Sequence, residues 1–192
     1  MTPDHLTEEA LAFLPKLARA TLDAAVRGLP RPEPEEIAAV LGFSLPNSLQ
    51  EPRGVFVTLT RNGRLRGCIG VIEAGAPLSI AVRDNALAAA FRDPRFDPLT
   101  ADELADTRIE ISVLTPMRPV RNTDDIVIPR HGVLLSKAGR RAVFLPQVAE
   151  EQGWDLDTTL THLALKAGLA ADDWREGAAF SVFEAEVVQE SP

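Results

Sequence analysis

The spacing of apolar residues predicts three long helices. The first covers Thr7 to Gly28, where leucines and alanines recur every three or four positions and a glycine ends the pattern. Pro15 removes a backbone donor inside this stretch, so we expect a kink or a helix start near it. The other two long helices are expected from Pro77 to Arg92 and from Asp157 to Ala167. Shorter helices are expected at 35–41, 100–105 and 146–151.

Two stretches have the pattern of a β-hairpin. Val55 to Thr60 is rich in β-branched residues, and Asn62-Gly63 is a strong two-residue turn signal ahead of a returning strand, Leu65 to Ile72. The second hairpin is expected to have its arms at 132–135 and 142–145 and its turn at 138–139.

Strict alternation marks one further strand, Ile109 to Leu114, whose polar residues Glu110 and Ser112 project to the same side. A closing strand is expected from Ala179 to Val188. Strands joined by tight turns pair antiparallel, and helices between them cover one face. The sequence therefore predicts an α+β fold, mainly an antiparallel sheet covered by helices.

Length and composition suit an ordinary globular protein. The chain has 192 residues, of which 45% are apolar and 25% charged, so a full core is available without disulfides or metals. We expect one domain over residues 1–192, or two tightly joined subdomains. The net charge of −8 disfavours non-specific nucleic-acid binding. The arginines at 61, 64 and 66 form either a solvated edge or a local anion site.

Features of an exported or membrane protein are not found in the sequence. Cys68 is the one cysteine, so no intrachain disulfide can form. The first residues are polar and acidic rather than basic and then apolar, as a signal peptide would be. No apolar run approaches the roughly 20 residues that span a bilayer. We therefore predict a cytoplasmic protein in which Cys68 remains a thiol.

The segment Leu65-Arg66-Gly67-Cys68-Ile69-Gly70 carries the strongest chemical signal. Strand alternation would put Arg66 and Cys68 on one face, where the guanidinium favours a thiolate. Gly67 and Gly70 weaken a strand unless a bulge or a close ligand needs the space. Cys68 is therefore a candidate reactive or ligand-binding thiol. The alternative is an inert cysteine that packs as a small apolar group.

Several stretches together resemble the AMMECR domain family, whose bacterial members are called AmmeMemoRadiSam system protein A. The likeness runs from about Leu11 to Val188, and Pro15 departs from the unbroken first helix that the family suggests. The matching stretches are 54–59, 65–70, 93–96, 98–100, 109–114, 131–132, 145–149 and 151–155.

The resemblance implies an α+β fold of a larger and a smaller subdomain, with Leu65 to Gly70 near a cleft between them. It also implies an association with a Memo-like protein, similar to extradiol dioxygenases, and with a radical S-adenosylmethionine protein. It does not imply one agreed activity.

Other polar residues are candidates beside Cys68. His131 is a candidate base for the thiol, or else it caps a turn. Glu110 is a candidate general base or partner of Arg66, and Ser112 would line the same pocket. The alternative for both is the solvated face of a half-buried sheet.

Two further residues are candidate ligand contacts. Arg95 in a proline-bounded loop would hold a carboxylate or phosphate, or would tie the loop to the body through a neighbouring aspartate. Gln147 flanks a short helical turn together with Trp154, which is more often a core or interface residue. The spacing of cysteine and histidine supports no metal site, and the lysine and hydroxyl of a phosphate loop are absent. We predict no cofactor.

Two main hypotheses follow for the function. The first is a small-molecule-binding or catalytic component centred on Cys68, active with Memo-like and radical S-adenosylmethionine partners. The second is a non-catalytic module that binds those partners. Specific RNA recognition is a third, and it requires a localised basic groove despite the negative total charge.

Overall fold

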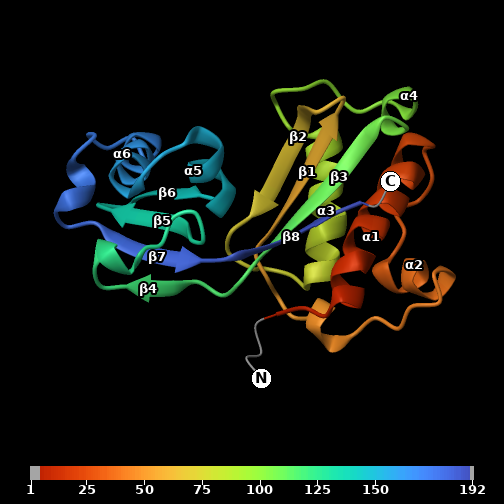
Figure 1. The fold of residues 1–192 in the computed structure, drawn as a ribbon. Coiled ribbons are helices and arrows are strands. Elements are labelled where there is room, and N and C mark those ends of the chain that lie inside the picture. Colours follow the sequence, from red (N-terminus) through yellow and green to blue (C-terminus); the bar gives the residue numbers. More distant parts are fainter. Residues whose placement is uncertain (1–4, 191–192) are drawn as a thin grey trace. The chain divides into compact units, whose positions relative to one another are not determined.

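The computed structural model describes residues 5–190, and the chain divides into two compact units (Figure 1). The larger unit comprises the chain up to Leu114 together with the segment from Glu186 onward. The smaller unit comprises Thr115–Ala185. Each unit has its own antiparallel sheet, its own helices and its own apolar core, which confirms the predicted α+β fold.

The sheet of the larger unit has four strands in the order β2-β1-β3-β8. β1 lies between β2 and β3 and pairs antiparallel with both. The strands are β1 (Val55–Arg61), β2 (Arg64–Val71), β3 (Thr107–Leu114) and β8 (Ala185–Gln189). The helices of this unit are α1 (Glu8–Val26), α2 (Pro34–Val40), the 3-10 turn η1 (Asn47–Leu49), α3 (Leu78–Phe91) and α4 (Ala101–Leu104).

Helix α1 begins well before Pro15. The Thr7 side chain caps it by accepting a hydrogen bond from the Ala10 N–H at 3.2 Å. Pro15 lies inside the helix and is buried with Leu14 and Leu17. The expected helix start near Pro15 is therefore wrong. The apolar face of α1 gains more from packing than one missing backbone hydrogen bond costs.

One face of the larger sheet is covered by helices. α3 packs on β1 and β2, and α1 packs on α3 and β3. Val57, Leu59 and Ile111 point toward these helices and are fully buried in the core. The alternate residues of β1, Phe56 and Thr58 among them, therefore point to the opposite side, which we call the second face.

The first hairpin turn has the backbone that its sequence requires. Asn62 and Gly63 have φ of 51° and 73°, the two positive angles of a type I′ turn. Ala138 and Gly139 turn the second hairpin in the same way, with φ of 50° and 78°. Both predicted hairpins are confirmed, since β1 pairs with β2 and the strands flanking Ala138 pair with each other.

The sheet of the smaller unit has the order β4-β7-β5-β6, with every neighbouring pair antiparallel. Its core joins the inner faces of these strands to α6 and includes Val133, Leu135, Leu160, Leu163 and Val182. The strands are β4 (Arg118–Val120), β5 (Gly132–Lys137), β6 (Arg140–Phe144) and β7 (Ala179–Phe183). The helices are η2 (Thr123–Asp125), α5 (Pro146–Gln152), α6 (Leu156–Lys166) and η3 (Asp173–Arg175).

Two strand predictions are wrong. The expected single strand from Ala179 to Val188 is two strands, because the chain leaves the smaller sheet at Glu184 and enters the larger one as β8. β4 lies in a stretch in which no strand was predicted. It has three residues, Pro119 among them, and depends on pairing with β7 rather than on its own pattern.

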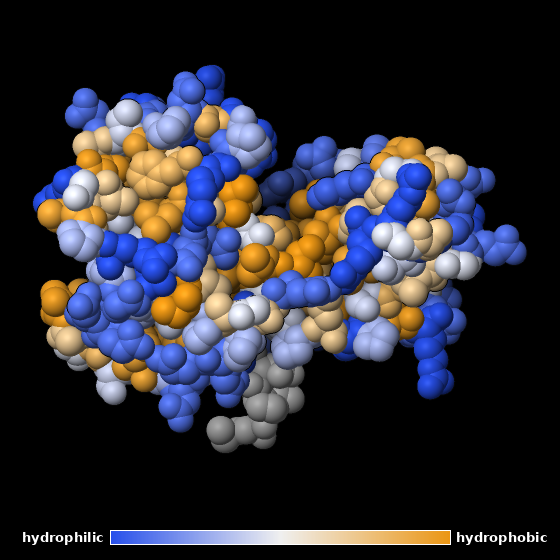
Figure 2. All heavy atoms as spheres, turned by 180° about the vertical axis from the view of Figure 1, so that it is seen from behind, coloured by the Kyte–Doolittle hydropathy of each residue, from blue (hydrophilic) through white to orange (hydrophobic). Residues whose placement is uncertain are grey.

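The molecular surface mixes polar and apolar residues. Figure 2 shows hydrophobic side chains exposed among hydrophilic ones on one face of the molecule. Val40 at the end of α2 is 87% exposed and Leu41 beside it is 47% exposed. Among residues 5–190, no helix combines the length and the apolar character that crossing a bilayer requires.

Candidate functional site

A β-bulge in β2 sets which side chains accompany Cys68. Leu59 of β1 pairs with Gly67, but the next residue, Thr60, pairs with Leu65, so Arg66 is one extra residue in the strand. The bulge shifts the alternation, and Leu65 rather than Arg66 shares the second face with Cys68. The prediction that Arg66 and Cys68 share a face is therefore wrong.

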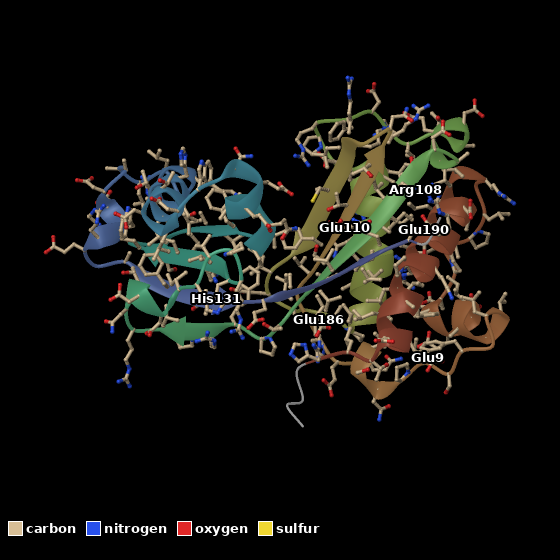
Figure 3. All side chains as sticks on the ribbon, in the orientation of Figure 1. Glu9, Arg108, Glu110, His131, Glu186 and Glu190 are labelled. Atoms are coloured by element: carbon tan, nitrogen blue, oxygen red, sulfur yellow. The ribbon has the colours of Figure 1, made fainter. Side chains whose placement is uncertain are left out.

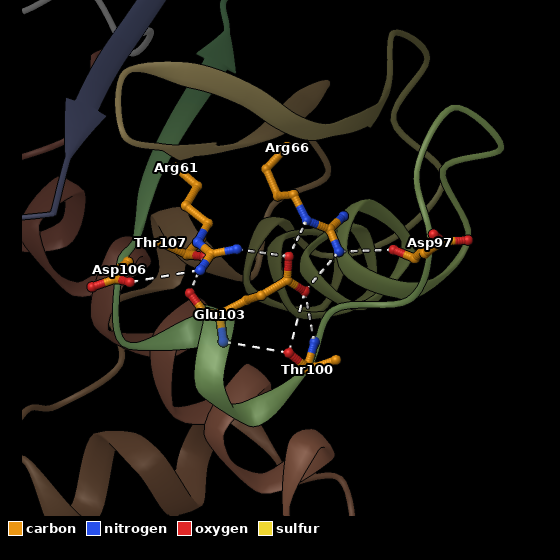
Figure 4. A network of polar contacts seen from close by, with 7 residues as sticks. All are labelled: Arg61, Arg66, Asp97, Thr100, Glu103, Asp106 and Thr107. Carbon is orange, nitrogen blue, oxygen red and sulfur yellow. Dashed lines mark hydrogen bonds and ion pairs between the residues drawn. The ribbon is translucent and has the colours of Figure 1, made fainter.

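The Arg66 guanidinium instead binds the carboxylate of Glu103 in α4 (Figure 4). Nε donates to Oε1 at 3.2 Å and Nη2 donates to Oε2 at 3.0 Å, while Nη2 also reaches the Asp97 carbonyl at 2.9 Å. Arg61 Nη1 donates to the same Oε1 at 3.1 Å. Arg61, Arg66 and Glu103 together form what we call the Glu103 cluster. Glu103 is the carboxylate paired with Arg66, so the ion-pair alternative for Glu110 is wrong.

The helix cap of α4 holds Glu103 in this position. Thr100 and Glu103 form the capping box that the sequence predicts, with the Thr100 N–H donating to Glu103 Oε2 at 3.1 Å. Hydrogen bonds from Arg66 and Thr100 lower the pKa of Glu103 from 4.5 to about 2. The capping box was visible in the sequence. The contacts of Glu103 with Arg61 and Arg66 were not visible there, because the two arginines come from other elements.

Cys68 itself is half-buried and held by three polar contacts. The Thr58 hydroxyl donates to Sγ at 3.3 Å. The Cys68 N–H donates to Asp93 Oδ2 at 2.9 Å, and the Cys68 carbonyl accepts from Arg95 Nη2 at 3.4 Å. The sulfur therefore has a polar neighbour and belongs to a half-buried residue, unlike a cysteine packed only among hydrocarbon groups.

Arg95 ties its loop to the body through Asp93, which is one of the two roles expected for it. Its Nε and Nη2 donate to the Asp93 carboxylate at 2.9 and 2.7 Å. Asp93 is buried, and the hydrogen bond from Arg95 holds the pKa of its carboxyl well below the ordinary value. Since β2 is an edge strand, this pair covers the backbone groups of Cys68 that no neighbouring strand binds.

The strand register aligns Cys68 with two further polar residues. Thr58 lies opposite Cys68 on one side and opposite Glu110 on the other. Directly opposed residues of antiparallel strands project to the same face, so these three form a row across β2, β1 and β3 that we call the Cys68 row. Glu110 Oε2 accepts a hydrogen bond from Gln189 Nε2 of β8 at 2.8 Å.

Thr58 was missed as a candidate because its role depends on register. In the sequence, Thr58 is only a polar position within a predicted strand. The pairing of β1 with β2 that brings it to Cys68 is not a property of β1 alone. Ser112 lies in the next pair along, opposite Phe56, and is 1% exposed. It is thus a buried serine, and the expected solvated face does not describe it.

The smaller unit holds the remaining candidates. His131 is buried, its Nδ1 accepts from the Val127 N–H at 2.9 Å, and Arg118 Nη2 lies 3.1 Å from Nε2. Burial, followed by the nearby charges of Arg118 and Arg130, lowers the pKa of His131. These contacts favour the structural alternative for His131, and its pairing with Cys68 stays a prediction.

Gln147 is the second residue of α5 and is half-buried, and its ligand contact stays a prediction. Trp154 stacks on His162, with ring centroids 4.1 Å apart and planes 4° from parallel. Over residues 5–190, no group of three or more histidine, cysteine, aspartate or glutamate side chains is arranged to hold a metal ion.

The AMMECR1 family model matches residues 15–188 of the chain, a range that includes the Cys68 row and both sheets apart from Gln189. The chain belongs to the AMMECR1 family. This confirms the resemblance inferred from the sequence.

Relatives that match over most of their own length agree with this family assignment. Protein Mbar_A1807 of Methanosarcina barkeri is 40% identical over 180 residues, covering 91% of this chain and 87% of the relative. Protein MJ0810 of Methanocaldococcus jannaschii is 37% identical and covers 96% and 92%. The crystal structure of the uncharacterized protein PH0010 from Pyrococcus horikoshii has a TM-score of 0.85 at 33% identity, covering 97% and 94%.

The two glycines of the AMMECR1-like segment are explained by the protein's own packing. A Cβ at Gly67 would lie 2.2 Å from the Ala89 carbonyl oxygen of α3, and one at Gly70 would lie 2.4 Å from the Phe56 ring. The space expected for a ligand beside Gly67 and Gly70 is therefore filled by α3 and by Phe56. A ligand approaching Cys68 must do so along the second face of the sheet.

Proposed function

We propose that this AMMECR1-family protein is a small-molecule-binding or catalytic component that uses the thiol of Cys68. The observation that carries the proposal is the Cys68 row, in which a thiol, a hydroxyl and a carboxylate face the same side of three adjacent strands. A nucleophile beside groups able to hold or move a proton is the usual arrangement for thiol chemistry.

Thr58 lies between Cys68 and Glu110 in the row. Its hydroxyl donates its one proton to Cys68 Sγ, so its oxygen remains an acceptor. Glu110 has one carboxylate oxygen bound to Gln189 and another that accepts nothing from the described residues. Glu110 therefore offers a free acceptor oxygen to a ligand that lies along the row, and Asp93 fixes the backbone that positions the sulfur.

The partners of the proposed activity are the Memo-like protein and the radical S-adenosylmethionine protein that the family resemblance implies. The protein's own site contains a thiol, a hydroxyl and carboxylates among its described residues, and this set alone does not define a complete reaction. We therefore expect any turnover to require those partners, while ligand binding and thiol reactivity belong to this chain.

Alkylation by iodoacetamide tests the proposal, because Cys68 is the one cysteine of the chain. The folded protein should react at Cys68, and Cys68→Ser, which has no thiol, is the negative control. Thr58→Val removes the donor to Sγ and should slow alkylation by about threefold to tenfold, the effect of one hydrogen bond on a charged sulfur. Ser44→Ala, which removes an exposed hydroxyl of the same unit, is the matched control.

Two results would overturn the proposal. One is alkylation that occurs only after the protein is unfolded, since the sulfur would then be closed to any ligand. The other is a Thr58→Val protein that is fully folded and reacts at the wild-type rate, since the row would then have no influence on the thiol.

Exposed apolar side chains favour a second candidate function, a non-catalytic module that binds the same partner proteins. Val40 and Leu41 lie beside Ile37, Ala20 and Ala24 in a shallow groove along α1 and α2. Apolar patches on a protein surface often mark contact sites. Calorimetric titration with the Memo-like protein tests this function, and a wild-type affinity in Val40→Asp would argue against it.

A further inference from the structure

A polar hollow of about 400 Å³ adjoins the Cys68 row in the larger unit. Its lining residues come from β1, from β3 and from the end of β8, and Glu110 belongs to both the row and the hollow. Thr60 and Arg108 form the next opposed pair along β1 and β3, on the same face. We call it the Arg108 hollow, and it is lined by Thr60, Arg108, Ile109, Glu110, Gln189 and Glu190.

One of the two carboxylates in the hollow is already neutralised by the protein. Arg19 of α1 binds Glu190, with Nε donating to Oε1 at 2.8 Å and Nη2 also donating to Oε2. This ion pair raises the pKa of Arg19 and fixes the end of β8 against α1. Glu190 therefore forms a wall of the hollow and adds little charge to it.

The other two charged side chains of the hollow, Arg108 and Glu110, do not pair with each other. Arg108 and Glu110 stand two residues apart on the same face of β3, and Figure 3 labels both beside Glu190. Among residues 5–190, the Arg108 guanidinium has no hydrogen bond or ion pair, and Glu110 binds Gln189 through one oxygen only. An unpaired guanidinium and an unpaired carboxylate oxygen thus line the same hollow.

We propose that the Arg108 hollow binds a small zwitterion of the amino-acid class. The planar guanidinium of Arg108 matches a carboxylate in a two-point contact, and Thr60, its partner in the strand register, adds a hydroxyl to the lining. The free oxygen of Glu110 accepts an ammonium group. The pair has no net charge, so a neutral ligand with two opposite charges complements it better than an anion or a cation alone.

This inference rests on the proposed function, since it names the class of ligand that the Cys68 site takes. Glu110 is shared, so a ligand whose ammonium group contacts Glu110 extends along the row toward Thr58 and Cys68. The carboxylate end is held in the hollow. The remainder of the ligand lies over the second face, where Cys68 is half-buried.

Ligand-detected NMR titration of the full chain tests the inference. The probes are the twenty amino acids, with acetate, methylamine and inorganic phosphate as single-charge comparisons. We expect at least one amino acid to bind about tenfold or more tightly than acetate and methylamine, since two contacts act together. Arg108→Gln and Glu110→Gln should each weaken that binding about tenfold or more, and Arg64→Gln, an exposed arginine of the same sheet, should leave it unchanged.

Failure of the inference is distinguishable from failure of the proposed function. Binding of acetate or phosphate as tightly as of any amino acid would overturn the zwitterion, as would the absence of binding by all twenty. Arg64→Gln, which lies outside the row and the hollow, should retain both amino-acid binding and the wild-type alkylation rate. A protein that binds an amino acid but never alkylates when folded would support the hollow and overturn the role of the thiol.

Discussion

The Glu103 cluster and the Arg108 hollow both place arginines beside a glutamate, yet they differ in how the charges are used. In the cluster, Glu103 receives hydrogen bonds from Arg61, Arg66 and Thr100, and these join α4 to β1 and β2. In the hollow, Arg108 and Glu110 stand side by side without pairing. The paired carboxylate of Glu103 stabilises the fold, whereas unpaired charges in a concave place are available to a ligand.

The bulge at Arg66 produces this difference. Without the extra residue, Arg66 would project beside Cys68, and the second face would carry a cation next to the thiol. With the bulge, Arg66 joins the structural cluster, and the cation nearest to Glu110 along β3 is Arg108. Substitutions on the two sides should accordingly change different quantities, stability on one and ligand binding or thiol reactivity on the other.

The largest stability effect is expected at Gly67. In Gly67→Ala the new Cβ would meet the backbone oxygen of Ala89, which cannot move without shifting α3, so we expect a loss of about 3 kcal/mol in the free energy of unfolding. Gly75→Ala is the control, because a Cβ there meets nothing within 4 Å. Urea unfolding measures both, and equal stability of the two variants would refute the packing account.

A smaller loss is expected from Glu103→Gln. The amide keeps the shape of the side chain but loses the charge that faces two arginines, and we expect about 1 to 2 kcal/mol of destabilisation at neutral pH. Asp102→Asn changes a neighbouring exposed acid of α4 and should lower the free energy of unfolding by less than Glu103→Gln does. Thermal unfolding of the two variants compares them.

The same variant should show a defined pH dependence. Because the pKa of Glu103 is about 2 in the folded protein and 4.5 ordinarily, the unfolded chain binds the proton first as the pH falls. The stability difference between wild type and Glu103→Gln should therefore be full above pH 4.5 and disappear as the pH falls toward 2. A difference that is constant over this range would contradict the ion-pair account.

The smallest stability effects are expected on the second face. Arg108→Gln and Cys68→Ser should change the free energy of unfolding by less than about 0.5 kcal/mol, because neither side chain is required by the core. Their effects should appear instead in amino-acid binding and in alkylation. A large loss of stability in Arg108→Gln would show that this arginine has a structural partner, and the contrast between the two glutamates would then vanish.

Local chemistry made much of the secondary structure predictable. The turn at Asn62-Gly63 and the capping box from Thr100 to Glu103 depend on residues within four positions of one another, and both form as expected. The division of the last predicted strand between two sheets was not predictable in this way. Its pattern is continuous, and only its pairing partners separate Phe183 from Ala185.

The sequence predicted several residues of the candidate site but not how they are arranged. Cys68 and Glu110 were both singled out, but their connection through Thr58 depends on the register of three strands. Arg66 was assigned to the thiol because strict alternation puts it there, and the bulge moves it to Glu103. Arg108 was not singled out at all, since an exposed arginine on a strand has no distinguishing pattern.

The sequence by itself determined the α+β class, the two hairpins, most helix boundaries and the relation to the AMMECR1 family, because these follow from periodicity, turn residues and short motifs. Tertiary structure alone decided which polar groups meet. Register, one bulged residue and the partners of an edge strand depend on contacts between segments far apart in the chain, and no local pattern encodes them.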